Sequence, residues 1–150
     1  MVDADTESDA VAAAFFAAFG NRDGREVDLA ALDSLCLPGC VIVRRGPEGV
    51  DVMDLTAFAA PRQALLTSGR LTDFEEREDA ARTFLSGGVA CRVCTYSKSG
   101  TLDGRPYRGR GFKSLHLVRT GQGWRISAVI WEDAPEGVDL DANVMTGRAS

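Results

Sequence analysis

The stretch that decides the fold is YRGRGFKSLHLVRTGQGWRISAVIWED, residues 107–133. Its centre, Thr120-Gly-Gln-Gly123, consists of turn residues and separates two runs that are rich in aromatic and β-branched side chains. Two such runs joined by a short turn are typical of neighbouring antiparallel strands. We therefore predict strands over about 107–119 and 124–133.

Both predicted strands have large apolar side chains on each of their faces. Side chains alternate between the two faces of a strand. In the second strand one face has Trp124, Ile126, Ala128, Ile130 and Glu132, and the other has Val129, Trp131 and Asp133. A sheet that is apolar on both faces must be covered on both. Helices can cover one face, and the simplest cover for part of the other is a second copy of the chain.

Further strand-like runs precede this stretch, and turn residues separate them. Two of them span about 71–85 and 89–98, with Gly87-Gly88 between them. A shorter strand, Val41–Val43, lies upstream. Consecutive strands with short turns predict an antiparallel meander.

The N-terminal part of the chain has a helical period instead. Apolar spacing predicts a helix over 9–19 and a shorter one over about 27–35. Asp54 can cap a third helix, and Pro61 is expected to begin a separate helical piece that ends near Thr67, because proline disrupts a helix interior. Helices followed by a sheet predict an α+β fold.

The composition predicts one ordinary globular domain. The chain has 150 residues, 45% of them hydrophobic, and 17 basic against 22 acidic side chains give a formal net charge of −5. That charge argues against nucleic acid or an anionic membrane as a partner. We divide the chain into a flexible acidic N-terminus at 1–8, a domain at 9–134 and a loosely held tail at 135–150.

No signal for secretion, membrane insertion, a metal or a cofactor is visible in the sequence. The acidic N-terminus is unlike a secretory signal, and no apolar run is long enough to span a membrane, so we expect a cytoplasmic protein. Cys91 and Cys94 have the spacing of a metal or redox motif, but strand residues three apart lie on opposite faces. Cys36 and Cys40 flank a Pro-Gly turn, and a disulfide between them stays open.

Three stretches are informative together: VAAAFFAAFGNRD at 11–23, RTGQGWRI at 119–126 and VIWED at 129–133. They resemble the nuclear transport factor 2-like (NTF2-like) superfamily, including its SnoaL-like proteins. APRQALLT at 60–67 and DFEE at 73–76 are similar to a bacterial subgroup of unassigned function. The resemblance implies a cone-shaped (cystatin-like) fold, in which a strongly bent antiparallel sheet wraps around about three N-terminal helices. It also implies a pocket at the wide end and homodimers paired through the sheet.

The resemblance further implies where functional residues lie. It places Glu132 near the pocket mouth and Arg62 in the same space, and these two, with His116, are the candidate acid/base or electrostatic groups. The implied pocket residues are Phe15, Phe19, Phe58, Arg62, Tyr96, Leu115, Ile130 and Glu132. The dimer interface is expected at Val129, Trp131 and His116.

Several chemistries found in the superfamily fit these residues poorly. A steroid isomerase needs a tyrosine in the first helix and a carboxylate base after the first strand, where this chain has Phe15 or Phe16 and Arg44. A dehydratase that relies on two histidines is excluded by the single histidine, His116. Epoxide hydrolysis by two aspartates and an arginine stays open, with Arg62 among the available arginines.

The basic segment Arg105–Lys113 contains two aromatic residues, a pattern that nucleic-acid sites also use. Its glycines do not form a phosphate-binding P-loop, because no glycine directly precedes the lysine and no helix follows it. We interpret the segment as a charged strand edge that discourages pairing with other chains and that can attract a small anion.

The sequence therefore predicts a homodimer whose mostly apolar pocket binds a small organic molecule. Isomerase, cyclase and hydrolase activities are open to it, and whether it is an enzyme at all is undecided. The alternative is a non-catalytic association module with a filled pocket. A cavity of roughly 300 Å³ or more favours ligand binding, whereas a cone filled by Phe15, Phe58 and Phe84 favours the alternative.

Overall fold

The computed structural model describes residues 4–138 and residue 140. Its helical elements are α1 (Ala4–Ala17), α2 (Leu55–Thr67) and two short 3₁₀ helices, η1 (Arg22–Gly24) and η2 (Leu29–Ser34). Its strands are β1 (Cys36–Gly46), β2 (Gly49–Met53), β3 (Leu71–Ser86), β4 (Val89–Leu102), β5 (Arg105–Thr120) and β6 (Gly123–Asp133). The predicted α+β class is confirmed.

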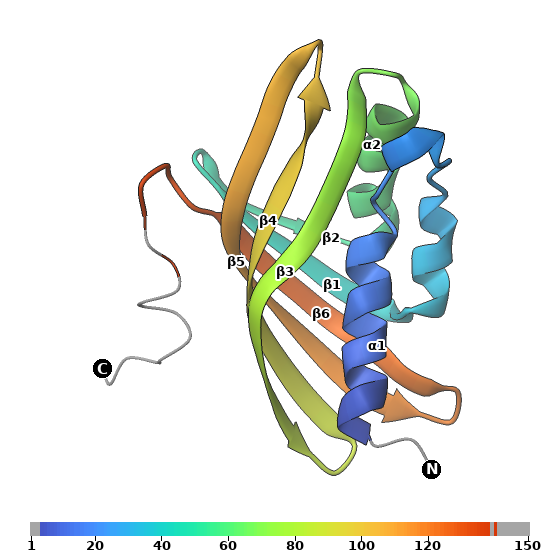
Figure 1. Cartoon of the computed structure of the whole chain (residues 1–150). Helices are drawn as coiled ribbons and strands as arrows, with labels where there is room; N and C mark the ends of the chain where they lie inside the picture. The colour runs from blue at the N-terminus through green and yellow to red at the C-terminus, as the bar shows by residue number, and fades with distance from the viewer. Residues whose placement is uncertain (1–3, 139, 141–150) are drawn as a thin grey trace.

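The six strands form one open, bent sheet in the order β2-β1-β6-β5-β4-β3 (Figure 1). β3 to β6 form the predicted antiparallel meander. The prediction of a wholly antiparallel sheet is wrong for β1, which pairs with β6 in parallel. The chain between these strands includes α2 and three long strands, so a short turn does not constrain their relative direction. β2, whose five residues form an exposed edge of the sheet, was not predicted.

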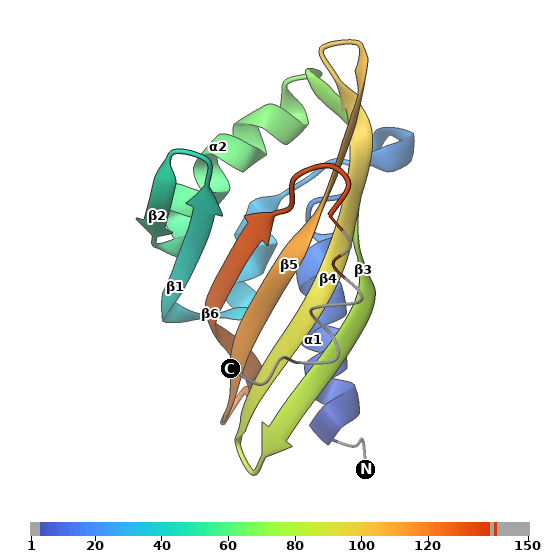
Figure 2. The same ribbon diagram turned by 90° about the vertical axis from the view of Figure 1, so that its left-hand side faces the viewer.

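Both α-helices lie on the same face of the sheet, which we call the inner face (Figure 1). The core between helices and sheet contains three phenylalanines from the helices, a fourth just after α1, and apolar side chains from the strands. Its members include Phe15, Phe16, Phe58, Phe19, Ile42, Leu115, Ile126 and Val129. Figure 2 shows the opposite, outer face, over which residues 134–138 turn back after β6.

Helix α2 is continuous, so the predicted break at Pro61 is wrong. Asp54 caps its first turn, accepting a 2.7 Å hydrogen bond from the Ala57 amide. Proline removes one backbone hydrogen bond from a helix interior. Phe58 before it and Leu66 after it are both buried in the same core, and this packing keeps the two halves in one helix.

The ends of the domain differ in part from their predicted positions. Helix α1 begins at Ala4, and Ser8 is buried, so the first helix starts before the predicted boundary at residue 9. Of the predicted tail at 135–150, residues 139 and 141–150 lie outside the described part of the chain. The loose attachment of that tail stays a prediction.

A β-bulge in β6 decides which residues face the helices. His116 of β5 is opposite Ala128, whereas its neighbour Leu117 is opposite Ile126, so Ser127 is one extra residue in β6. An extra residue reverses the alternation of faces on one side of the bulge. Trp124 and Ile126 therefore face inward as predicted, but beyond Ser127 the inward positions are 129, 131 and 133 rather than 128, 130 and 132.

Asn21, which follows α1, connects a second bulge, in β3, to the end of α2 through hydrogen bonds. Its side-chain amide donates to the carbonyl oxygens of Leu66 (3.0 Å) and Leu71 (2.8 Å), and its oxygen accepts from the amide of Phe74 (2.8 Å). The register of β3 shifts at this point, with Asp73 in a left-handed conformation (φ 50°). The bulge bends β3 and turns the Phe74 ring toward the inner face.

Candidate functional site

A cavity of about 330 Å³ lies between the inner face of the sheet and helices α1 and α2. Most of its wall is apolar and aromatic, formed by Phe15, Phe19, Phe58, Leu65, Leu66, Leu71, Phe74, Val129 and Trp131. A cavity of this size holds a small organic molecule. Because Phe15 and Phe58 line the cavity rather than fill it, and Phe84 is 57% exposed on the outer face, the cone is not plugged in the way the alternative requires.

Charged side chains interrupt this apolar wall: Arg44, Arg62, Lys98, Lys113, Glu76 and Asp133. They comprise four cations and two carboxylates, so the cavity has a formal charge of +2. Charged groups at an apolar site need partners or a ligand, because burial penalises an isolated charge. The pairing of these six side chains therefore indicates what the cavity can bind.

Asp133 is held by two side chains from β4, which must cross β5 to reach β6. Lys98 Nζ lies 2.9 Å from Asp133 Oδ2, and Tyr96 Oη donates to Asp133 Oδ1. The crossing is possible because β5 has glycine at 109 and 111. A Cβ at Gly109 would overlap the Lys98 chain, and a Cβ at Gly111 would overlap Tyr96 Oη and the carbonyl oxygen of residue 132. The Gly-Arg-Gly sequence of β5 thus makes room for the Tyr96–Asp133–Lys98 cluster.

Asp133 is ionised at neutral pH. Burial alone raises the pKa of its carboxyl, but the hydrogen bond from Tyr96 and the ion pair with Lys98 outweigh burial and hold the pKa below the ordinary value of 3.8. Burial and the hydrogen bond to Asp133 raise the pKa of Tyr96, so its hydroxyl keeps its proton. The cavity therefore contains a fixed carboxylate with a proton donor beside it.

We expect Asp133→Asn to lower stability at pH 7 by about 1–2 kcal/mol, a value discounted because solvent reaches this half-buried group. The folded-state pKa is below the unfolded one, so the carboxylate stabilises fully above about pH 5, and this contribution is lost as pH falls through the lowered pKa. Urea unfolding between pH 7 and pH 3 should show the gap between wild type and variant narrowing toward acid. A gap of constant size contradicts the pairing.

The second carboxylate, Glu76, is also neutralised by a lysine. Lys113 Nζ lies 2.8 Å from Glu76 Oε1, and both side chains are nearly buried. Aromatic rings surround the same ammonium, with centroid distances of 4.6 Å for Phe16 and 4.7 Å for Tyr96. Both carboxylates of the cavity thus have a lysine of their own.

Arg62 projects from α2 over two aromatic rings. Its guanidinium carbon lies 4.1 Å from the centroid of the Phe58 ring and 5.4 Å from that of Trp131. One nitrogen, Nη1, donates a 2.9 Å hydrogen bond to the carbonyl oxygen of Phe58. Burial lowers the pKa of Arg62, and the positive charge of Arg44 lowers it further.

The structure places four of the predicted pocket residues in the cavity wall, namely Phe15, Phe19, Phe58 and Arg62. Tyr96 and Leu115 face inward and are buried beside the cavity without being part of its wall. The prediction is wrong for Ile130 and Glu132, which the bulge at Ser127 turns to the outer face. Ile130 is 43% exposed, and Glu132 pairs there with Arg45 at 2.7 Å.

The bulge also overturns two of the three residues predicted for a dimer interface. Val129 and Trp131 face inward, where they are buried and line the cavity, so they cannot contact a second copy of the chain through the outer face. His116 does lie exposed on the outer face, next to Cys91. The catalytic candidates Glu132 and His116 are therefore both outside the cavity, and Arg62 alone of the three is inside it.

The other charged residues of the cavity were not predicted from the sequence. Lys113 was expected at a charged strand edge, yet it is 5% exposed and faces inward. The basic segment Arg105–Lys113 is in fact divided between the two faces, since Arg108 and Arg110 line a groove on the outer side. The available signal was the pair of glycines at 109 and 111, because glycine inside a strand often marks the close approach of another group.

The four cysteines are free thiols. Cys36 and Cys40 are buried, and their side chains form a hydrogen bond with each other across an irregular part of β1. This hydrogen bond raises the pKa of Cys36 and lowers that of Cys40. Cys94 is buried on the inner face, and Cys91 lies on the other face. Within residues 4–138 and 140, no cluster of three or more ligating side chains could hold a metal ion.

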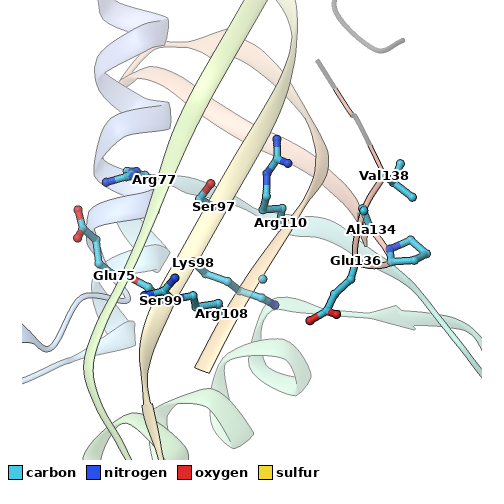
Figure 3. Close-up of a pocket in the computed structure, with 13 residues that line it drawn as sticks. Glu75, Arg77, Ser97, Lys98, Ser99, Arg108, Arg110, Ala134, Glu136 and Val138 are labelled. Atoms are coloured by element: carbon cyan, nitrogen blue, oxygen red, sulfur yellow. The ribbon is translucent and has the colours of Figure 1, made fainter. Parts of the chain in front are cut away.

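A second hollow lies on the outer face, over β3, β4 and β5, and has a volume of about 540 Å³. Figure 3 shows Ser97 and Arg110 on the strands and Glu136 and Val138 on the segment that follows β6. Unlike the inner cavity, this groove has no aromatic side chain in its wall. The inner cavity, with aromatic surfaces and converging charged groups, is the better candidate site.

Comparison with known proteins bears on the fold. No protein-family profile matches the sequence, and no curated protein matches it. Among solved structures, an NTF2-like superfamily protein from Salmonella enterica has 15% identity and a TM-score of 0.71, covering 90% of this chain and 94% of its own. An NTF2-like protein with a cystatin-like fold from Novosphingobium aromaticivorans has 17% identity and a TM-score of 0.66. The match covers 89% of this chain and 82% of that one.

A third similar structure is named as a proposed calcium/calmodulin-dependent kinase II association domain, from Exiguobacterium sibiricum. It has 8% identity and a TM-score of 0.69, and the match covers 91% of this chain and 98% of that one. None of the helices in the described part of the chain is long and apolar enough to cross a membrane. The chain therefore has the fold of these NTF2-like structures, which one of them describes as cystatin-like.

Proposed function

We propose that this protein binds a small organic molecule in the inner cavity. The observation that supports this most is the cavity itself: about 330 Å³ of space, lined by aromatic rings, into which six charged side chains project. A protein that needed only a stable core would fill such a space, because interiors pack densely and cavities cost stability. Charged groups in the wall of an apolar cavity are typical of sites that orient a ligand.

We further propose that the protein is cytoplasmic and belongs to the SnoaL-like subgroup, as expected from the sequence. If isomerase, cyclase or hydrolase chemistry occurs, Asp133 and Arg62 are the groups placed to take part, since both line the cavity. Asp133 is ionised, but its lowered pKa and its contacts with Tyr96 and Lys98 make it a weak base, so it suits the orientation of a polar group of the ligand. Arg62 suits the stabilisation of negative charge.

A cavity-filling variant tests ligand binding. Leu65 is half-buried on α2 and lines the cavity, so Leu65→Trp should occupy the space with little damage to the core. We expect the neutral aromatic probe 2-naphthamide to raise the thermal midpoint of the wild type with increasing concentration, by several degrees at about 100 times its Kd. The same probe should leave the thermal midpoint of Leu65→Trp unchanged.

Thr56→Trp is the matched control, since Thr56 is an exposed residue of the same helix that does not line the cavity. This variant should respond to 2-naphthamide like the wild type. An equal response of Leu65→Trp and Thr56→Trp would place binding elsewhere. No response of any of the three proteins, to this probe or to its carboxylate analogue 2-naphthoate, would contradict the proposal.

A second candidate function, association between copies of the chain, is favoured by the outer face. Four apolar side chains, each from a different strand, are 43–57% exposed there, namely Val41, Phe84, Val89 and Ile130. His116 lies on the same face. Exposed apolar groups on a sheet are typical of contact surfaces, and the homodimer through the sheet therefore stays part of the proposal.

We expect sedimentation velocity at micromolar concentration to show a dimer of the wild type. Ile130→Glu, which places a charge on the outer face, should shift the equilibrium at least tenfold toward monomer. Thr56→Glu, on the side of the helices, should sediment like the wild type. A monomeric wild type would contradict the dimer and would leave ligand binding in the cavity unaffected.

A further inference from the structure

The cavity has more positive charge than its own carboxylates can neutralise. Glu76 is paired with Lys113 at 2.8 Å, and Asp133 is paired with Lys98 at 2.9 Å. Both carboxylates are thus already matched by a lysine. The two arginines, Arg44 and Arg62, account for the remaining formal charge of +2.

Arg62 has no carboxylate partner within 4.0 Å among the residues that the structure describes. Its contacts are the carbonyl oxygen of Phe58 and the faces of the Phe58 and Trp131 rings. Aromatic faces attract a guanidinium but do not neutralise it. A guanidinium has five N–H donors, and Nη1 alone makes a hydrogen bond within the described residues. Arg62 therefore retains donors that a ligand can use.

Arg44 reaches the cavity from the sheet. It is opposite Trp131 in the β1–β6 ladder, so both side chains lie on the inner face. Its ion pair with Asp51 is long, 4.0 Å, and the Asp51 side chain is 64% exposed, which makes the pair weak. The Arg44 charge acts on Arg62 strongly enough to lower its pKa, after the larger effect of burial. An anion between the two guanidiniums would relieve this repulsion.

From this arrangement we infer that the ligand is a small organic acid with a flat apolar body, whose carboxylate binds between Arg62 and Arg44. The inference rests on the proposed ligand-binding function and specifies the chemical class of the ligand. Guanidiniums bind carboxylates with two parallel hydrogen bonds, which fixes the orientation of the acid group. The rings of Phe19, Phe58 and Trp131 then provide the surface for the apolar body.

Matched probes that differ only in charge test the inference. We would measure, by isothermal titration calorimetry on the full chain, the Kd values of 2-naphthoate, its neutral analogue 2-naphthamide and the cation 2-naphthylmethylammonium. The wild type should bind the acid at least about tenfold more tightly than the amide, a difference of about 1.4 kcal/mol. The ammonium compound should bind more weakly than either.

Variants then locate the acid group. Arg62→Gln should reduce the affinity for 2-naphthoate to that for 2-naphthamide while changing the affinity for the amide less than twofold, and Arg62→Lys should recover part of the preference. Arg45→Gln is the matched control, because Arg45 is the next residue to Arg44 but lies on the outer face with Glu132. It should leave both affinities unchanged. If Arg62→Gln fails to fold, Arg44→Gln provides the same comparison.

The outcomes separate this inference from the proposed function. Equal affinities of the wild type for acid and amide, both lost in Leu65→Trp, would overturn the inference and leave ligand binding supported. A variant Arg62→Gln that weakens acid and amide to the same extent would show that Arg62 acts by packing against Phe58, which also overturns it. Failure of all three compounds to bind would contradict both.

Discussion

Replacing Trp131 by alanine should destabilise the protein by about 3–5 kcal/mol, the range for removal of a large buried aromatic side chain. Trp131 is 7% exposed, and its ring lies 5.5 Å from that of Phe58 in an edge-to-face contact. Its loss removes this contact, the surface under Arg62 and part of the cavity wall. Chemical unfolding followed by circular dichroism should show the loss, and the thermal midpoint should fall by about 10 °C.

Ile130, the residue before Trp131, provides the matched control for this substitution. Ile130 is 43% exposed on the outer face, so Ile130→Ala should cost less than about 1 kcal/mol when both variants are compared at a concentration at which the protein is monomeric. Plain alternation along β6, without the bulge at Ser127, predicts the reverse order of the two effects. An Ile130→Ala variant that is as unstable as Trp131→Ala, or less stable than it, would contradict the inward position of Trp131.

Gly111→Ala should be the most damaging single-methyl change in the sheet, at about 3 kcal/mol. The added Cβ would overlap Tyr96 Oη and the carbonyl oxygen of residue 132. The carbonyl belongs to the backbone of the neighbouring strand, so it cannot move aside without distorting the sheet. The Tyr96 hydroxyl would lose its position beside Asp133 as well.

Alanine substitutions at two other glycines provide controls with smaller expected effects. Gly109→Ala would overlap the flexible side chain of Lys98 alone, so its cost should be intermediate. Gly121→Ala meets nothing within 4 Å and has no left-handed backbone, so it should change stability by less than about 0.5 kcal/mol. Urea unfolding of the three variants should reproduce this order. A Gly111→Ala variant as stable as Gly121→Ala would show that Tyr96 does not cross β5 at this point.

The sequence predicted the four long strands well because turn residues mark their ends. Gly87-Gly88 and Thr120-Gly-Gln-Gly123 separate β3 from β4 and β5 from β6 as expected. The parallel pairing of β1 with β6 has no comparable local signal, because it depends on contacts between segments far apart in the chain. β2 is at the sheet edge and has only five residues, so the alternation of Val50, Asp51 and Val52 is too short to distinguish a strand from a loop.

The candidate site was harder to predict than the fold. The aromatic wall could be inferred, since Phe15, Phe19 and Phe58 lie on the apolar sides of the helices that the sequence predicts. The charged groups could not be inferred, because the one-residue bulge at Ser127 turns Asp133, instead of Glu132, toward the cavity. Nothing in the residue types near Ser127 marks this bulge. Its position follows from the register between β5 and β6, which only the folded structure shows.

The most direct test of the cavity as a binding site is a methyl NMR titration of the full chain with 2-naphthoate. Methyl groups of leucine and valine sample both faces of the sheet. If the ligand enters the inner cavity, signals of Leu65, Leu66, Leu71 and Val129 should shift with one saturating curve, while those of Val41, Val52 and Val89 on the outer side stay in place. Shifts confined to the outer valines, or no shifts at millimolar probe, would contradict binding in the cavity.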